Sequence, residues 1–591
     1  SSVFYNGIDS LALCLSESFG ERTQKEYVSY IKSARANNKK YTLLLRQSVP
    51  YDTLQIIRKF PILRLGRGRG GFISEIRENR EYPYGELAYM SIGFLPRDHR
   101  PTVGIECSMD SVLRGTEGIL YQRHIDKRTL VQDVTKESYP AVNGLDVQST
   151  IDIDIQDIAT RALKNKISNE EDLQAGCVIV MEVATGAIRA MVSLSKDANG
   201  NFSESFDSYN YAIGYLGEPG SVFKLATLVT ALEDKKVTLE TEQRADVILQ
   251  FNKTKFEDTY LRNYSTITVA KGLEISSNNV FRRIAGEYYR HNPQEFVDKL
   301  NNERKISYNF DFDIPGLAKA RINSPKDKHW SLTDLPQIGM GYAVKLTPLH
   351  ILSFYNAIAN YGVMVKPHIV ENWQRNGVIE KEFPVETIGR VCSEKTAETA
   401  RTALRGVVIG SNGTARNAFK NCKIDVAGKT GTARVALSHG YVDSKGHKRH
   451  QGSFVGFFPY ENPKYSVIVV VHSCLSFKNF YGGTWGGPVA REIAETIYAS
   501  SPEWGEHLNS GKSLPAVAEY KAFSANDTIE GIPSVIGMGL REATYYLESR
   551  GYTVSSEGSG KVKSQSPAPG DTIANGDRKI NILLSDNYEI K

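Results

Sequence analysis

The chain has 591 residues, of which 41% are hydrophobic and 24% charged, and 72 Lys and Arg against 67 Asp and Glu leave a formal net charge of +5. These values are typical of folded soluble protein, and they exclude disordered, collagen-like and coiled-coil classes. No nucleic-acid partner is expected, because the Arg-rich stretch 64–70 is short, interrupted by glycine and interpreted as a solvated loop. At roughly 100–200 residues per domain, the length predicts three or four units.

The six cysteines are scattered along the chain, and none forms a CxxC or Cys/His spacing. A zinc site and a disulfide scaffold are therefore not expected, while single pairs of cysteines stay possible. Cys177 and Cys474 lie in apolar runs that predict buried thiols. The chain opens at Ser1 without an initiator Met, so we expect either that a leader was removed or that the sequence begins after one. No apolar run reaches the 18 residues that a membrane helix needs.

The order of the predicted elements indicates four segments. Residues 1–145 are mixed and polar, with a helix expected over 16–39, and they predict a scaffold or partner-binding module. Residues 146–500 contain two predicted hairpins, with helices expected between them over 221–232 and 348–361. The strands of the hairpins are predicted over 176–183, 187–193, 452–458 and 465–472. Strands at both ends predict one α+β domain whose sheet is closed by sequence-distant halves. A linker over 501–528 and a small unit over 529–591 follow.

Ser221 and Lys224 lie at the predicted start of an apolar helix, in the sequence EPGSVFK. A serine in the first turn is close to free backbone N–H groups, and a lysine one turn later lies on the same face. Burial would lower the pKa of that lysine, so its neutral amine could accept the serine proton. The alternative is a solvated helix pair, since Ser-x-x-Lys also occurs at residues 29–32 and 193–196.

Ser276 and Asn278 form a second candidate pair, at the end of a predicted helix over 269–275. The hydroxyl could relay a proton, and the amide could hold a peptide carbonyl. A polar loop is the alternative, because Ser-x-Asn also occurs elsewhere in the chain, for example at 208–210, 307–309 and 524–526.

Lys429, Thr430, Gly431 and Thr432 lie on a probable strand before the second hairpin. A lysine and a hydroxyl beside a glycine that allows close backbone approach suit a carboxylate of a substrate. The N–H after the glycine could face a developing oxyanion. An edge strand that carries a solvated lysine is the alternative.

The three motifs together are more specific than any one of them. Ser-x-x-Lys, Ser-x-Asn and Lys-Thr-Gly follow in this order, 55 residues apart (221 to 276) and then 153 (276 to 429). This set is the signature of β-lactamases and penicillin-binding proteins, except that Ser277 stands where the usual form has Asp. On these motifs the chain resembles a class B penicillin-binding protein.

Further segments extend the resemblance over nearly the whole chain. The segments 210–212, 347–350, 359–362, 454–459 and 482–488 resemble the family's transpeptidase domain, 80–85, 104–106 and 113–115 its N-terminal module, and 532–537 and 562–570 a PASTA domain. The resemblance implies a transpeptidase-like domain with an antiparallel sheet flanked by helices, between an N-terminal class B module and a C-terminal PASTA unit. This combination is most similar to cell-division transpeptidases.

The resemblance also implies a mechanism. Ser221 would attack the bond between two terminal D-alanines of a peptidoglycan stem peptide and form an acyl-enzyme, with Lys224 as the base. Ser276 would relay a proton to the leaving amine, and Asn278 would hold Lys224 and the substrate backbone.

For the substrate, Lys429 and Thr430 would bind the terminal carboxylate, and the backbone N–H groups of Ser221 and Thr432 would form the oxyanion hole. No metal and no organic cofactor is implied. β-Lactams would acylate Ser221, because their strained amide mimics the D-Ala-D-Ala bond.

The implied partners are stem peptides, β-lactam antibiotics, a glycosyltransferase and other division proteins. The implied location is the extracytoplasmic face of the inner membrane, with an N-terminal anchoring helix missing from this chain. A D,D-carboxypeptidase is the first alternative activity, and a β-lactamase or β-lactam sensor is the second. A non-catalytic division scaffold is the alternative from another class. The acceptor amine, the oligomeric state and a role in elongation stay open.

Overall fold

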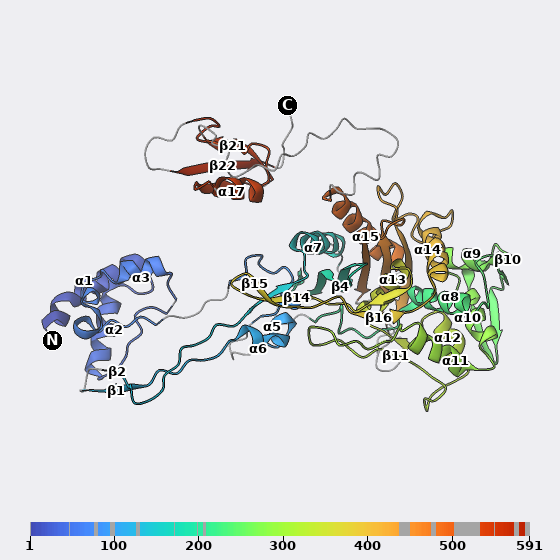
Figure 1. Cartoon of the computed structure of the whole chain (residues 1–591), viewed down its shortest axis with the longest axis horizontal. Coiled ribbons are helices and arrows are strands. Elements are labelled where there is room, and N and C mark those ends of the chain that lie inside the picture. The colour runs from blue at the N-terminus through green and yellow to red at the C-terminus, as the bar shows by residue number, and fades with distance from the viewer. Residues whose placement is uncertain are drawn as a thin grey trace. The chain divides into compact units, whose positions relative to one another are not determined.

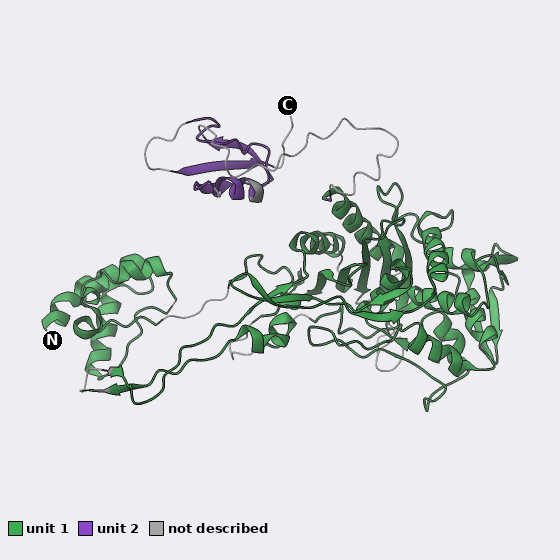
Figure 2. Cartoon of the chain, viewed as in Figure 1, with its two compact units in different colours: residues 1–500 green, residues 501–591 purple. Residues whose placement is uncertain are grey.

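The computed structural model describes two compact units, residues 1–500 and 501–591 (Figure 2). Within them, the residues described are 2–585 without these positions: 47, 76–80, 95–100, 126–129, 169, 171, 198, 205–208, 436–448, 474–479, 502–531, 549, 559 and 572–577. Cys474 and nearly all of the predicted linker therefore lie outside the described residues. No helix in the described ranges is both long enough and apolar enough to cross a bilayer.

An antiparallel sheet of six strands forms the core of the first unit, in the order β17-β18-β19-β4-β5-β6. Its strands are β4 Leu173–Glu182, β5 Ile188–Lys196, β6 Phe202–Ser203, β17 Ala427–Arg434, β18 His450–Phe458 and β19 Tyr465–Ser473. Both predicted hairpins are confirmed, β4 with β5 and β18 with β19. The pair Val469–Val178 joins β19 to β4 across 291 positions (469 − 178), so distant halves of the chain close the sheet, as predicted.

Helices cover both faces of this sheet. Nearly every residue of β18 and β19 is buried, including positions that alternate between the two faces. One pair of helices, α7 Ile153–Ile167 and α15 Gly482–Ala499, packs together on β4, β5, β18 and β19. A second pair, α13 Pro348–Ala359 and α14 Glu394–Ile409, packs on β17, β18 and β19. Figure 1 labels β4 of this sheet, with α7, α13, α14 and α15 around it. The α+β class predicted from the sequence is confirmed.

The segment between β6 and β17 supplies the helices that carry two of the candidate motifs. These are η3 Gly220–Phe223, α8 Lys224–Glu233, α9 Val269–Glu274 and α10 Asn278–Tyr288. The expected helix over 221–232 begins as a 3-10 turn, and the α-helix starts only at Lys224. The other elements up to α14 are β7 Glu242–Arg244, β8 Ile248–Phe251, β9 Thr254–Glu257, η4 Thr259–Leu261, β10 Thr266–Thr268, α11 Pro293–Asp298, η5 Lys299–Glu303, β11 Arg321–Ile322, α12 Asp334–Gly339, β12 Val344–Lys345, β13 Val363–Val365, β14 Val370–Arg375, β15 Val378–Glu382 and β16 Thr387–Arg390.

The N-terminal region differs from the expectation of one helix over 16–39. Two helices are present, α1 Ser2–Phe19 and α2 Gln24–Ala36. Gly20 between them has a left-handed φ of 62°, and the Thr23 side chain caps α2. The stretch 64–70, expected as a loop, forms short helical turns whose arginines are exposed. The elements after α2 are α3 Tyr51–Ile57, η1 Leu63–Leu65, η2 Gly66–Gly70, α4 Tyr89–Ile92, α5 Gly104–Ser108, α6 Asp110–Leu113, β1 Gln122–His124, β2 Leu130–Gln132 and β3 Asp146–Ser149.

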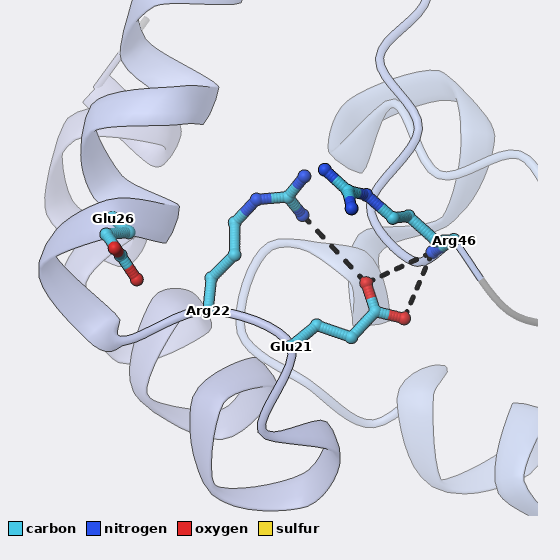
Figure 3. A pocket seen from close by; sticks show the side chains of 4 residues that line it. All are labelled: Glu21, Arg22, Glu26 and Arg46. Atoms are coloured by element: carbon cyan, nitrogen blue, oxygen red, sulfur yellow. Dashed lines mark hydrogen bonds and ion pairs between the residues drawn. The ribbon is translucent and has the colours of Figure 1, made fainter.

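A charged hollow of about 470 Å³ lies on these N-terminal helices (Figure 3). Glu21, Arg22, Glu26 and Arg46 line it, and Figure 3 shows the Glu21 carboxylate between the two arginines. That carboxylate accepts a hydrogen bond of 3.1 Å from the Arg46 backbone N–H and lies 4.0 Å from the Arg22 guanidinium. These contacts fix the chain after α2 against the α1–α2 turn, so the hollow has a structural explanation.

The described residues of the second unit form one helix and a three-stranded sheet. They are α17 Leu540–Glu548, β20 Thr553–Glu557, β21 Lys561–Ser566 and β22 Lys579–Ser585. The central strand β22 runs parallel to β20 and antiparallel to β21. The sequence carries little signal for β21, because only Val562 and Gln565 of its six residues are buried and the others are mostly polar. The small core contains Val535, Ala543, Leu547, Val562 and Ile580.

Candidate active site

Ser221 lies in a tight turn between a buried helix and the edge of the sheet. Gly220, just before it, has a φ of 60°, and its N–H donates to the Gly341 carbonyl over 3.0 Å. A Cβ at Gly220 would lie 3.0 Å from the Thr432 carbonyl oxygen, so a glycine here allows the turn to approach β17. Ser221 is half-buried, and its hydroxyl forms no hydrogen bond with any residue in the described ranges.

Lys224 is fully buried at the start of α8, among side chains that are nearly all buried as well. Its Nζ lies within hydrogen-bond distance of three oxygens: the Ser276 carbonyl at 2.7 Å, the Asn278 Oδ1 at 2.8 Å and the Ser276 Oγ at 3.2 Å. A neutral amine donates to the first two, and the Ser276 hydroxyl can donate to its lone pair. Burial, and then the nearby charge of Lys429, lower the pKa of Lys224 well below its ordinary value. The structure thus favours a neutral amine one helical turn after the nucleophile.

Lys429, on the edge strand β17, also binds Ser276. It is fully buried, and its Nζ donates to the Ser276 Oγ and to the Thr430 carbonyl, each over 2.9 Å. Burial lowers the pKa of Lys429 to about 7. The Ser276 hydroxyl therefore lies between two lysine amines, which is the arrangement needed to pass a proton from one to the other.

The remaining predicted residues lie along β17, at one edge of the sheet. Thr430 shares a hydrogen bond of 2.6 Å with the Thr414 hydroxyl, and the Thr432 Oγ1 accepts from the Gly482 N–H over 3.2 Å. Gly431 allows close packing, because a Cβ there would overlap the Ser453 hydroxyl. An edge strand has N–H groups outside the ladder, so β17 can present such donors to a substrate.

The structure brings the three motifs together, with one difference from the expected geometry. Ser276, Asn278 and Lys429 converge on or beside Lys224 through the hydrogen bonds above. The expected direct pair of Ser221 and Lys224 is not among the hydrogen bonds of the described residues, and the hydrogen bonds of the Lys224 Nζ in these residues go to Ser276 and Asn278 of the second motif. The oxyanion role of the Ser221 and Thr432 N–H groups stays a prediction.

Sequence reasoning missed two polar residues that support these motifs. Thr414 contacts Thr430 from the loop after α14. Asp258 is buried and accepts hydrogen bonds from Ser277 and from the Asn279 backbone. Neither belongs to a motif of fixed spacing; the one local signal is the Asp-Thr pair at 258–259, which suits a helix cap.

A hydroxyl at the start of a buried helix, a lysine with a lowered pKa, a bridging serine and a second lysine on an edge strand define a serine-nucleophile acyl-transfer site. Residues 176–498 match the family model described as penicillin binding protein transpeptidase domain, and residues 531–586 match the PASTA domain. The first match covers more than half of the chain. The chain belongs to the penicillin-binding protein transpeptidase family, which confirms the family predicted from the three motifs.

Curated relatives agree with this assignment, and a solved structure shows the same fold. Stage V sporulation protein D of Bacillus subtilis is 28% identical over 532 residues, or 86% of this chain and 76% of that protein. Peptidoglycan D,D-transpeptidase FtsI of Buchnera aphidicola is 27% identical over 431 residues, or 71% and 69% of the two proteins. Penicillin Binding Protein 2X from Streptococcus thermophilus has the same fold, with a TM-score of 0.65 at 18% identity over 98% of this chain and 84% of that one.

Proposed function

We propose that this chain is a serine-type peptidoglycan D,D-transpeptidase that cross-links stem peptides through an acyl-enzyme on Ser221. The observation that carries this proposal is the Ser276 hydroxyl, which is hydrogen-bonded to both Lys224 and Lys429. Membership of the transpeptidase family and a relative named peptidoglycan D,D-transpeptidase FtsI support the substrate class.

The acylation step follows from the positions of these groups. The Ser221 Oγ attacks the carbonyl carbon between two terminal D-alanines while the neutral Lys224 amine takes its proton. The proton passes through Ser276 to the nitrogen of the leaving D-alanine, the C–N bond breaks, and an ester to Ser221 remains. N–H groups of Ser221 and Thr432 stabilise the oxyanion, and loss of one such donor typically slows the step by about a hundredfold or more.

The second step is the transfer of the acyl group to another stem peptide. An amine of that peptide attacks the ester carbonyl, Ser221 leaves with a proton returned through Lys224, and a new peptide bond forms. Before acylation, Lys429 and Thr430 hold the terminal carboxylate of the donor by a charge-assisted hydrogen bond and a hydroxyl contact. Asn278, bonded to Lys224, is placed to hold both this lysine and the donor backbone.

The proposal extends to the modules and the cellular role. Residues 1–145 act as a partner-binding scaffold, 146–500 as the transpeptidase domain, and 529–591 as the PASTA domain after a linker. The enzyme works in septal wall synthesis with a glycosyltransferase and other division proteins, anchored on the extracytoplasmic side of the membrane. The division role is supported by the relative named FtsI.

The test is the intact mass of the chain after incubation with benzylpenicillin, followed over hours for the parent and for Ser221→Ala. The parent should carry one persistent adduct, and the variant none, because it lacks the attacking oxygen. An adduct on Ser221→Ala contradicts the assignment of the nucleophile, and a transient adduct with consumption of the drug indicates a β-lactamase. With a stem-peptide donor and an amine acceptor, cross-linked product distinguishes a transpeptidase from a carboxypeptidase, which releases only D-alanine.

The acylation rate should pass through a maximum as the pH is raised, because it falls at both low and high pH. Acylation needs neutral Lys224, so the rate falls at low pH as this amine is protonated. Binding of the carboxylate needs cationic Lys429, whose pKa is lowered to about 7, so the rate constant at low drug concentration falls as pH rises above about 7. The measurement is the second-order acylation rate from pH 5 to 9. Benzylpenicillin methyl ester is the control: it has no carboxylate, and its profile should lack the fall at high pH.

A further inference from the structure

Asp258 lies beneath the second motif, outside all three sequence signatures. It is 2% exposed and precedes η4. Its Oδ2 accepts a hydrogen bond of 2.7 Å from the Ser277 hydroxyl and one of 2.9 Å from the Asn279 N–H. Its Oδ1 accepts from the Tyr260 N–H over 3.3 Å. This carboxylate therefore fastens the start of α10 to the segment before η4.

The joint held by Asp258 is strained. The helix α9 ends with the Ser276 N–H bonded to the Leu273 carbonyl at 3.0 Å and the Ser277 N–H bonded to the Gly272 carbonyl at 2.8 Å, a Schellman arrangement. The left-handed position of this motif usually holds glycine, but here Ser276 occupies it with a φ of 59°. A non-glycine residue keeps such a conformation only when the surrounding contacts enforce it.

Ser277 transmits the contact from Asp258 to this strained position. Its hydroxyl donates to Asp258 and also accepts from the Val280 N–H at 3.3 Å, which makes Ser277 the cap of α10. Ser277 directly follows Ser276 in the chain. The carbonyl and the hydroxyl of Ser276 are both hydrogen-bonded to Lys224. A shift of Ser277 would therefore displace the serine that bridges the two lysines.

Asp258 also brings a negative charge to a cluster of buried cations. The charged groups around Lys224 are Lys429 on β17, Arg282 on α10 and Asp258, and Tyr342 lies near Arg282. The two cations lower the pKa of Lys224, whereas the Asp258 carboxylate raises it. Replacing this carboxylate by a neutral group would make Lys224 lose its proton at a lower pH.

We propose that Asp258 is a positioning residue of the acyl-transfer site, which holds Ser276 between Lys224 and Lys429 and places a negative charge among the cations around Lys224. The proposal rests on the proposed function, because its effect is read in the acylation of Ser221. Asp258 contacts no reacting atom: it acts through Ser277 on the geometry and through its charge on Lys224.

The test is Asp258→Asn in the full chain, with the acylation rate by benzylpenicillin measured from pH 5 to 9. Loss of an anchoring contact should lower the maximal rate about ten- to a hundredfold. At low pH the acylation rate falls as Lys224 is protonated, and we call this part of the pH–rate profile its low-pH limb. Loss of the negative charge should move this limb toward lower pH, by on the order of one pH unit. A parental rate, or a limb that stays in place or moves to higher pH, overturns the proposal.

Ser277→Ala separates the two effects, because it removes the hydrogen bond to Asp258 and leaves the carboxylate charge. It should slow acylation about tenfold with the low-pH limb in place. If Asp258→Asn does not fold, as judged by circular dichroism, Ser277→Ala decides: a parental rate overturns the proposal and a slowed rate supports it.

Asp246→Asn is the matched control, because Asp246 also reaches α10 but forms its ion pairs with Arg244 and Arg283, and its side chain is 40% exposed. The acylation rate and the position of the low-pH limb of Asp246→Asn should equal those of the parent. If Asp246→Asn shifts the limb as far as Asp258→Asn does, the proposal is overturned. The failure of the proposed function is a separate result: in that case the unsubstituted chain itself forms no adduct on Ser221.

Discussion

Lys224→Met should slow acylation by benzylpenicillin strongly while the chain stays folded. Methionine has a similar length but no basic nitrogen, so nothing beside Ser221 takes its proton. General-base catalysis typically contributes about 10²–10⁴-fold, and we expect a loss of about 10³-fold in the acylation rate constant. The measurement is the rate of adduct formation by intact mass, with circular dichroism to verify the fold.

The fold should tolerate this substitution for an electrostatic reason. The folded chain holds Lys224 at a lowered pKa, so at neutral pH the unfolded chain binds its proton more readily, and that difference favours unfolding. Methionine removes this cost, which offsets the loss of the three hydrogen bonds made by Nζ. The thermal midpoint should therefore stay within a few degrees of the parent.

Lys236→Met is the control for Lys224→Met, because this lysine is exposed just after α8 and its loss should change neither property. Acylation of Lys224→Met at the parental rate would move the base role to another group. Of the described groups, Lys429 is the next amine, since it also binds the Ser276 hydroxyl.

The sheet and the three motifs could be predicted from sequence because each has a local signal. The strands β4 and β19 are β-branched runs that fit a pleated, buried surface, and turn residues separate each of them from its hairpin partner. The motifs have fixed spacing and order. The resemblance also implied that Asn278 would hold Lys224, and these two side chains form a hydrogen bond of 2.8 Å.

The supports of the motifs could not be predicted in the same way. Asp258 contacts Ser277 across 19 positions, and Thr414 contacts Thr430 across 16, with no repeated pattern that links the pairs. The left-handed backbone of Ser276 could also not be predicted from the sequence, because glycine is the usual residue in that conformation. Such contacts depend on how helices and strands pack, and the periodicity of a single segment does not predict that packing.

The position of the nucleophile depends on a second contact of this kind, between Gly220 and Gly341. Gly341 follows α12, has a φ of 91° and accepts a hydrogen bond of 3.0 Å from the Gly220 N–H. A Cβ at Gly341 would overlap the Gly220 carbonyl oxygen and lie 2.7 Å from the Phe223 Cβ. Gly220 also packs against Thr432 of β17. The turn that carries Ser221 therefore cannot shift away from Gly341 without meeting β17.

Gly341→Ala should therefore both destabilise the chain and displace Ser221. The left-handed backbone costs an alanine about 1–2 kcal/mol, and forced overpacking adds about 1–3 kcal/mol, so the free energy of unfolding should fall by roughly 3 kcal/mol. Acylation by benzylpenicillin should slow by about a hundredfold, because a shift near 1 Å at a reacting group typically has an effect of that size. Denaturant unfolding and intact-mass kinetics measure the two effects.

Gly377→Ala separates backbone strain from the clash at Gly341. Gly377 has a φ of 80° but no heavy atom within 4 Å of the position of an added Cβ, so alanine there meets only the backbone cost. This control should lose about 1–2 kcal/mol of stability and acylate at the parental rate. If Gly341→Ala behaved like Gly377→Ala in both measurements, the contact with Gly220 would not determine the position of Ser221. A larger loss of acylation in Gly341→Ala alone would show that the packing of the turn, and not overall stability, aligns the nucleophile.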